Sequence, residues 1–477
     1  MASKRLNTKN LEALGAQRLA ELLVEVSTAN AAVKRRLRLE LAGSQSSGEV
    51  SKEVRKRLTT VARSRSFIDW QNRKSLIEDL EAQRRAIVNQ VAKTDPTEAL
   101  ELMWRFVSIA NSVFERCDDS SGAVISVFHA ACRELGEIAQ AAKAAQKTLA
   151  ERAFNALNEN DYGQYDELIS VLSPALGPAG LEELKKKFIE LSKAPPEQPK
   201  GTDRKVIGWG TGGPLYADEI ATSRRESTIR LALQEIADAQ GDVDAFIAQQ
   251  SEKAKTVPRV AAEIAQRLLD AGRADEAWSA INAVDEKRPG WIPFEWERVR
   301  LEVMEVLGRN VEAQAFRWQC FERTLSISHL RTYLKRLPEF EDLEAEERAI
   351  SHALESSSVH QALAFLVSWP ALEKAATLVT KRASELNGDH YEILSPAADT
   401  LAAKYPLAAT LLLRAMIDFT LKQGRASRYR YAARHNAECT SLASAIGDFG
   451  AVEPHRRYRN RLNQEHNRKT SFWALVP

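Results

Sequence analysis

A pattern that recurs after residue 240 constrains the fold more than any other feature of the sequence. The segments GDVDAFIA, GRADEAWSA and GRNVEAQAF begin at Gly241, Gly272 and Gly308, at spacings of 31 and 36 residues. Self-similarity at such a period is typical of helical-repeat proteins, in which each repeat is one helix pair. The glycine is expected to take the left-handed conformation that closes one helix, and the acidic residue that follows it favours the start of the next. The pattern therefore predicts stacked helix-turn-helix units.

The same segments share a small residue that fits close helix packing. An alanine stands a few residues after each glycine, at Ala245, Ala277 and Ala313. A period near 34 residues is that of tetratricopeptide arrays, but the tyrosine and tryptophan signature positions of that repeat are not all present. We therefore expect an all-α protein with two helical domains, the C-terminal one a tetratricopeptide-like α-solenoid of stacked helix pairs.

Helical periodicity also dominates the N-terminal part. Leucines and valines recur at steps of three and four residues over residues 11–41, which predicts an amphipathic helix pair broken near residues 27–30. A second helix is predicted to begin at Pro96, with Asp95 as its cap and Glu98 completing a capping box. Its apolar stripe is expected to contain Leu100, Met103, Trp104 and Val107.

Prolines and glycines interrupt the helical pattern over residues 192–215. We interpret residues 196–222 as a connector between an N-terminal helical domain, residues 1–195, and a C-terminal helical-repeat domain, residues 223–477. The segment GWGTGGP lacks the lysine and hydroxyl that end a phosphate-binding loop, and no strand is expected before it. Ile207 and Trp209 are expected to anchor this segment onto a helical domain.

Charge is distributed unevenly although the net charge is only +2. Residues 1–75 hold 16 basic and 7 acidic residues, a net of +9, and residues 422–477 hold 11 and 4, a net of +7. The residues between them carry −14. Basic ends could bind nucleic acid through its phosphates or dock onto the acidic middle, and solvated helix faces could also differ in sign by chance.

The spacing of the cysteines and the lack of long apolar runs indicate in which cellular compartment the protein is expected. The four cysteines are scattered and form no zinc-knuckle or redox pair, which fits a reducing environment. The N-terminus has no apolar run long enough for a signal peptide, and no stretch approaches the roughly 20 uncharged residues of a membrane span. We predict a cytoplasmic protein without membrane contact.

Four stretches carry a family resemblance. VARSRSFIDWQNRKSLIEDLEAQ and ERCDDSSGAVISVFHAAC resemble the N-terminal half of a group of bacterial helical proteins that includes SWIM zinc-finger proteins. YPLAATLLLRAMIDFTL and YRNRLNQEHNRKTSFW resemble the helical tail of the same group. The resemblance implies an α-helical solenoid of a largely uncharacterised bacterial family and implies no activity. The CxC and CxH pairs with which SWIM proteins bind zinc are absent here, so neither that metal nor its nucleic-acid association carries over.

Three groups of residues have the composition of a chemical site. Asp118 and Asp119 could bind a divalent cation, but Asp-Asp-Ser-Ser-Gly is also favourable turn and capping chemistry before a helix. His129 and Cys132 lie three residues apart on an apolar helix and are interpreted as core.

The third group lies near the C-terminus. His435 and Cys439 lie one helical turn apart and could bind zinc together with His455 or His466, although a histidine near a buried cysteine is usually a packing feature. No motif for nucleophilic catalysis is present. We therefore predict no metal, no cofactor and no enzymatic activity.

Arginine and tyrosine alternate in RASRYRYAARHNAE, where Arg428, Tyr431 and Arg434 are the predicted binding residues. Such residues can hold phosphates and stack on bases, or bind an acidic protein, or form stacked helix packing. The predicted function is a non-catalytic helical-repeat scaffold that binds a protein or peptide partner. One alternative is nucleic-acid association through the basic terminal segments, and a second is a metal-dependent enzyme of unknown reaction.

Overall fold

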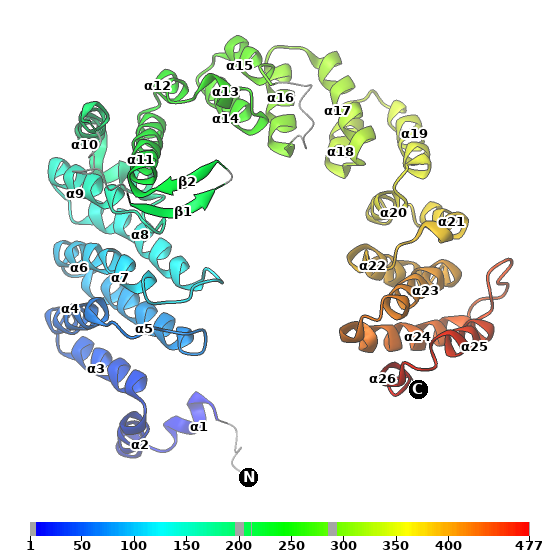
Figure 1. Ribbon diagram of the computed structural model, residues 1–477, viewed down its shortest axis with the longest axis horizontal. Coiled ribbons are helices and arrows are strands. Elements are labelled where there is room, and N and C mark those ends of the chain that lie inside the picture. Colours follow the sequence, from blue (N-terminus) through cyan, green and yellow to red (C-terminus); the bar gives the residue numbers. More distant parts are fainter. Residues whose placement is uncertain (1–5, 196–204, 211, 285–292, 477) are drawn as a thin grey trace. The chain divides into compact units, whose positions relative to one another are not determined.

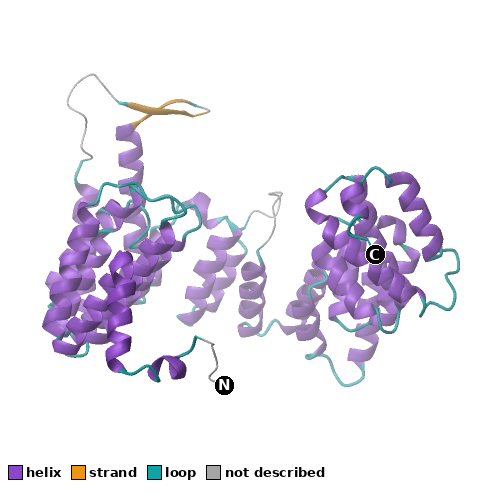
Figure 2. Ribbon diagram, turned by 90° about the horizontal axis from the view of Figure 1, so that it is seen from below, coloured by secondary structure: helices purple, strands orange, loops and turns teal. Residues whose placement is uncertain are grey.

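The protein is almost entirely helical, as the sequence predicts. The computed structural model describes residues 6–195, 205–210, 212–284 and 293–476. Two short strands form one antiparallel hairpin, and the other regular elements of these residues are helices (Figures 1 and 2). The chain divides into two compact units, Met1–Ala254 and Lys255–Pro477. None of the described helices combines the length and the apolar character needed to cross a membrane.

The first unit stacks helices on one continuous apolar core. Its helices are α1 (Thr8–Glu12), α2 (Ala16–Ala29), α3 (Ala31–Gln45), α4 (Ser47–Arg63), α5 (Arg73–Ala86), the π-helix η1 (Ile87–Val91), α6 (Pro96–Ser108), α7 (Ala110–Phe114), α8 (Ala123–Ala141), α9 (Gln146–Asn158), α10 (Leu168–Lys193), α11 (Ala217–Gln240) and α12 (Val243–Ala248). The strands are β1 (Val206–Gly210) and β2 (Gly213–Tyr216), and α13 (Glu252–Lys255) crosses the division between the units.

The second unit is built from helix pairs. Its helices are α14 (Pro258–Asp270), α15 (Ala274–Ile281), α16 (Phe294–Val306), α17 (Asn310–Thr324), α18 (Ile327–Leu334), α19 (Glu341–Glu355), α20 (Val359–Ser368), α21 (Leu372–Lys381), η2 (Ala383–Glu385), α22 (Tyr391–Leu401), α23 (Pro406–Lys422), η3 (Ala426–Arg428), α24 (Tyr429–Ala443), α25 (His455–His466) and α26 (Thr470–Trp473).

Contacts in the second unit follow the plan of a tetratricopeptide-like solenoid. The helices of each pair contact one another, as in α14 with α15 and α22 with α23. First helices also contact first helices of the next pair, and second helices contact second helices, as α20 with α22 and α21 with α23 do. Such stacking buries the apolar stripe of each helix against its neighbours, as a solenoid requires.

The repeated glycines close helices as predicted. Gly241, Gly272 and Gly308 have φ angles of 69°, 76° and 72°, the left-handed region. In each case the residue after the glycine donates its amide to a carbonyl five residues earlier, as Arg309 does to Met304 O at 2.8 Å. This is the hydrogen-bond pattern of a Schellman motif. Gly424, with a φ of 61°, follows the same pattern after α23.

The N-terminal predictions are confirmed except for the capping box at Glu98. The break near residues 27–30 separates α2 from α3, and the Asn30 side chain caps α3. Helix α6 begins at Pro96, where Asp95 Oδ1 accepts from the amide of Glu98 at 3.0 Å. The predicted stripe of α6 is buried. The Glu98 carboxylate, expected to complete a capping box, instead accepts a hydrogen bond from Arg55 of α4.

The division between the units lies later than the predicted connector. Ile229, Ala232 and Ile236 of α11 join the core of the first unit because α11 packs along α10. Residues 205–210 and 212–222 therefore belong structurally to the first unit, whereas residues 196–204 and 211 of the connector lie outside the described residues.

The glycine-rich segment also differs from its prediction. Residues 206–210 form β1, so a strand is present, and β2 pairs with it antiparallel ahead of α11 (Figure 1). Ile207 and Trp209 do not anchor the segment, because both are exposed and the Trp209 side chain is 79% exposed. In the part of the chain that the structure describes, the hairpin has two strands, and so small a sheet offers little apolar surface on which these two side chains could pack.

Glu235 of α11 is a half-buried carboxyl group near the start of α10. Burial is the main cause that raises the pKa of Glu235 from 4.5 to about 7, followed by the charges of Asp166, Asp238 and Glu167. The folded chain thus binds this proton more tightly than the unfolded chain does. The contribution of the protonated carboxyl to the stability of the folded chain is therefore complete below pH 4.5 and is lost as the pH rises towards 7.

We therefore expect Glu235→Gln to slow hydrogen exchange in α10 and α11 at pH 8, where the charged carboxylate opposes burial. The gain in stability at that pH is about 1–3 kcal/mol. At pH 5 the two proteins should differ little, once exchange rates are corrected for pH. An equal effect at both pH values would contradict the pKa shift.

Candidate functional site

Two large aromatic side chains point into solvent from the loop between α4 and α5. We call residues 64–72 the aromatic loop. Its Phe67 and Trp70 side chains are 69% and 68% exposed. Ile68, between them in sequence, packs against the core of the first unit. A single exposed apolar residue is ordinary in a folded protein, but two bulky aromatic residues on one short loop are the kind of surface that partners cover.

The backbone of the aromatic loop is held on both sides. Ile68 forms a parallel bridge to Cys117, with the Ile68 amide donating to Arg116 O at 2.7 Å and the Asp118 amide donating to Ile68 O at 3.2 Å. The Ser112 hydroxyl donates to Ala62 O at 2.8 Å, just before the loop. These bonds fix the loop against the segment that precedes α8.

A buried guanidinium completes this attachment. Arg116 is 8% exposed, and its Nη2 donates to Val61 O at 3.0 Å while its Nη1 donates to Ser66 O at 3.3 Å. Burial is the main cause that lowers the pKa of Arg116. Burial of a cation is unfavourable unless its N–H groups donate hydrogen bonds. The bonds to Val61 O and Ser66 O therefore hold the Arg116 side chain against the start of the loop.

Asp69 shapes the end of the loop. Its Oδ1 accepts from the amides of Gln71 at 3.1 Å and Asn72 at 2.9 Å, which forms a turn that leads into α5. Arg73, the first residue of α5, donates to Asp118 O at 3.0 Å. Phe67 and Trp70 are therefore displayed on an ordered backbone.

Asp118 and Asp119 act as turn and capping residues. The two carboxylate oxygens of Asp119 accept from the amides of Val124 and Ile125 at 3.0 and 2.9 Å, at the start of α8. Asp118 Oδ1 accepts from the amide of Ser120 at 3.1 Å. These contacts are those of the structural interpretation, and among the described residues neither carboxylate belongs to a group of three possible metal ligands.

His435 and Cys439 each have a separate partner. His435 Nδ1 lies 3.1 Å from Glu438 Oε2, and the Cys439 thiol contacts Thr410 O at 3.9 Å. Burial raises the pKa of Cys439 to about 12 and lowers that of His455 to about 4. Within the part of the chain that the structure describes, these residues and His466 do not converge on a metal position.

His129 and Cys132 contribute to hydrogen bonding and packing within the first unit. His129 Nε2 lies 2.9 Å from Gly163 O, and Cys132 is buried, which raises the pKa of its thiol to about 12. A thiol that titrates so high is a poor nucleophile.

The predicted binding residues Arg428, Tyr431 and Arg434 lie at or next to the start of α24. The Arg428 guanidinium is paired with Asp389 at 2.7 Å and lies over the Tyr391 ring. Arg434 is paired with Glu438 at 3.1 Å, and the Tyr431 hydroxyl accepts from Arg430 at 2.6 Å. The three residues stay a prediction, but their polar groups already have partners.

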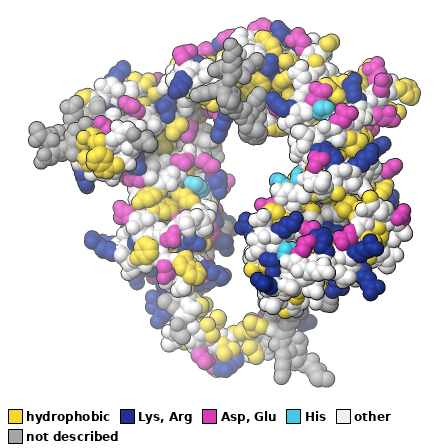
Figure 3. Space-filling view, turned by 45° about the vertical axis from the view of Figure 1, so that its right-hand side comes forward, with side chains coloured by type: hydrophobic (Ala, Val, Ile, Leu, Met, Phe, Trp, Pro, Cys, Tyr) yellow, Lys and Arg dark blue, Asp and Glu magenta, His cyan; other side chains and the backbone are white. Residues whose placement is uncertain are grey.

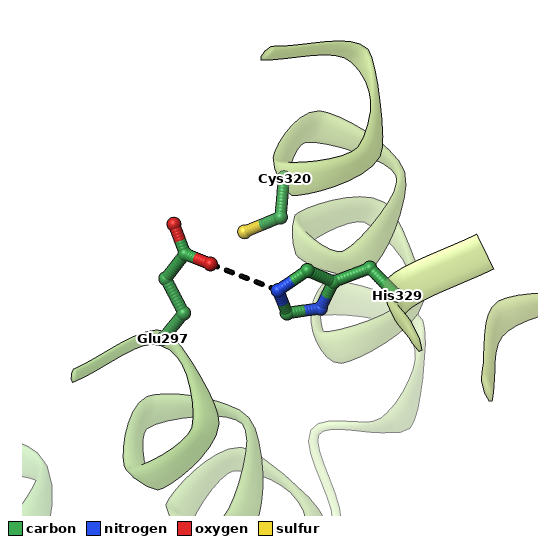
Figure 4. A group of neighbouring side chains, drawn as sticks. All are labelled: Glu297, Cys320 and His329. Atoms are coloured by element: carbon green, nitrogen blue, oxygen red, sulfur yellow. Dashed lines mark hydrogen bonds and ion pairs between the residues drawn. The ribbon is translucent and has the colours of Figure 1, made fainter. Parts of the chain in front are cut away.

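A cluster that the sequence did not reveal lies inside the second unit. Glu297 of α16, Cys320 of α17 and His329 of α18 bring one carboxylate oxygen, the sulfur and one ring nitrogen within 4.8 Å of one another, and all three residues are buried (Figure 4). The dashed line in Figure 4 joins Glu297 Oε2 to His329 Nε2 at 2.8 Å. Glu297 Oε1 accepts a hydrogen bond from Arg323 of α17.

We interpret this cluster as an ion-pair network that joins three helices. Both oxygens of Glu297 already have a donor, and the His329 contact has the length of a hydrogen bond. Burial, followed by the Glu297 charge, raises the pKa of Cys320 to about 12, which keeps sulfur in the thiol form. A metal ion would require the thiolate and the loss of the histidine hydrogen bond.

Comparison with known proteins places the chain in a family. Residues 1–475 match the family of unknown function DUF6880. The chain belongs to this family. The match agrees with the expected membership of an uncharacterised family. No curated protein matches the chain.

One similar solved structure is a circular tandem repeat protein with novel repeat topology and enhanced subunit contact surfaces. It shares 14% sequence identity over 94% of this chain and 99% of its own, with a TM-score of 0.18. At this TM-score the similarity carries no argument about the fold, which rests on the helix pairs described above.

For this member of DUF6880, sequence reasoning did not identify Phe67 and Trp70 as site residues, although their stretch carried the family resemblance. The sequence did contain a signal for an exposed aromatic loop: Phe67, Ile68 and Trp70 cluster around Asp69 in a segment without helical periodicity. The Glu297 cluster gave no comparable signal, since its members lie up to 32 residues apart and converge only after three helices pack.

Proposed function

We propose that this chain is a non-catalytic helical-repeat scaffold that binds a protein or peptide partner through the aromatic loop. The observation that carries the proposal is the exposure of Phe67 and Trp70 on a backbone fixed by Ile68 and Arg116. Aromatic side chains dominate the binding energy of protein interfaces, and a fixed loop loses little conformational entropy on binding.

The apolar surface at stake is large enough to support binding. Covering the exposed parts of the two rings would remove roughly 250 Å² from water, which corresponds to about 6 kcal/mol before the costs of association. The ion-paired residues around Arg428 offer less, because a partner would first have to displace existing contacts.

The cytoplasm is the proposed location of this function. The four cysteines are free and buried, which is compatible with a reducing compartment. A scaffold of this kind needs no cofactor.

The test compares capture of partners by variants of the full chain. Phe67→Ala combined with Trp70→Ala should leave the melting temperature nearly unchanged, because both rings are exposed. It should weaken partner binding by roughly 30-fold or more, the loss of at least 2 kcal/mol that central aromatic residues carry. Capture from cell extract after nuclease treatment, followed by titration of the captured partner, measures both effects.

The matched control removes equally exposed aromatic residues elsewhere. Trp209 is 79% and Phe340 82% exposed, on the hairpin and before α19. Trp209→Ala combined with Phe340→Ala should keep the partner. Retention of the partner by the Phe67 and Trp70 variant, or equal loss in the control, would rule out the aromatic loop as the binding surface.

A further inference from the structure

Four exposed cations flank the aromatic loop in the sequence or lie within it. Lys56 and Arg63 of α4, Arg65 in the loop and Lys74 of α5 are exposed. Among the described residues, none of these four charged groups forms a hydrogen bond or an ion pair, whereas Arg84 and Arg85 on the same α5 both pair with Glu81. The loop thus lies among free positive charges.

Two of these cations line a shallow hollow that leads to the loop. The hollow has a volume of about 630 Å³ and is lined by Lys56, Thr59, Thr60, Arg63 and Ser64. Ser64 is the first residue of the aromatic loop, so the hollow opens directly beside it. Its lining contains two cations and three hydroxyl-bearing residues and no carboxylate.

We propose that the partner is an acidic peptide segment with a large apolar side chain next to its carboxylates. This inference rests on the proposed function, because it names the partner of the same loop. The carboxylates lie in the hollow, where Lys56 and Arg63 neutralise them, and the apolar side chain packs against Phe67 and Trp70. The apolar contact supplies most of the affinity, while the exposed charge pairs add specificity and salt dependence.

The surroundings favour a peptide over nucleic acid. Asp69 lies next to Trp70, and the exposed Asp118 lies beside Ile68 through its backbone hydrogen bond. A nucleic-acid strand carries a charge on every phosphate and would meet these carboxylates as it crossed the loop, whereas a peptide can place its carboxylates only over the hollow. On the face drawn in Figure 3, basic and acidic side chains are interspersed and no extended basic field is seen.

The test selects random phage-displayed peptides on the full-length chain and discards those that also bind the Phe67→Ala, Trp70→Ala variant. The selected peptides are expected to carry Asp or Glu beside Phe, Leu or Trp. Lys56→Glu combined with Arg63→Glu should weaken a synthetic copy of the best peptide by roughly tenfold or more, because two attractive contacts become repulsive. Lys147→Glu with Lys186→Glu, which reverses two exposed cations on α9 and α10, is the matched control and should leave binding unchanged.

The outcomes separate the two proposals. Loop-dependent peptides that lack acidic residues and ignore the Lys56 and Arg63 reversal would overturn this inference and leave the proposed function intact. Failure to select any peptide that depends on Phe67 and Trp70 would overturn both. Competition by an oligothymidylate strand that the same charge reversal abolishes would assign the surface to nucleic acid and overturn the acidic-peptide inference.

Discussion

Replacing Glu297 by alanine is expected to destabilise the second unit by about 3–5 kcal/mol, the cost of removing one partner from a buried ionic network. The carboxylate is 4% exposed and accepts from both Arg323 and His329. Without it the His329 ring nitrogen is left buried with no acceptor, and the joint between α16, α17 and α18 loses its polar contacts. Urea unfolding, with hydrogen exchange of peptides from these helices, measures the effect.

Glu302→Ala is the matched control on the same helix. The Glu302 side chain is 42% exposed and, among the described residues, its ion pair is with Arg298 one turn away, so its loss should cost about 0.5 kcal/mol or less. A Glu297→Ala variant no less stable than this control would refute the network. A structural metal predicts instead that Cys320→Ala is as damaging as Glu297→Ala and that a chelator destabilises the purified protein, whereas the network predicts a cost of about 1 kcal/mol for Cys320→Ala and no chelator effect.

The parts of the fold that sequence predicted are those set by local chemistry. Gly241, Gly272 and Gly308 close helices because left-handed backbone is accessible to glycine wherever it occurs in the fold. Asp95 caps α6 because the orphan amides it satisfies lie within three residues. These signals depend on neighbours in sequence, so one chain suffices to detect them.

The parts that sequence missed depend on contacts between distant segments. Whether Trp209 packs or points into water is decided by what lies beneath the hairpin. The predicted metal pair, His435 and Cys439, lies one helical turn apart, whereas the cluster found among the described residues joins three helices across the 32 residues from Glu297 to His329. Likewise, the exposure of Phe67 and Trp70 on an ordered loop depends on the bridge between Ile68 and Cys117, which lies 49 positions later in the chain.

Arg116→Ala is expected to damage both the stability of the first unit and the binding surface. The substitution removes the guanidinium donors to the carbonyls of Val61 and Ser66 and empties the space of a buried side chain. Val61 O keeps the hydrogen bond that it accepts from the Ser64 amide at 3.2 Å. The loss of two charge-assisted hydrogen bonds corresponds to about 2–4 kcal/mol, of which part is regained because a buried cation no longer has to be desolvated.

Arg116→Ala should also weaken partner binding, because Arg116 holds the loop that displays Phe67 and Trp70. A loosened loop loses conformational entropy when it becomes ordered on binding, so the affinity for the partner should fall roughly tenfold or more. Faster hydrogen exchange confined to residues 61–72 would show that the loop has loosened while the helices stay folded. Arg73→Ala, which removes a hydrogen bond to Asp118 O at the other end of the loop, is the control and should retain most of the affinity. If Arg116→Ala bound the partner as tightly as the unmodified chain, preorganisation of the aromatic loop would not be the basis of binding.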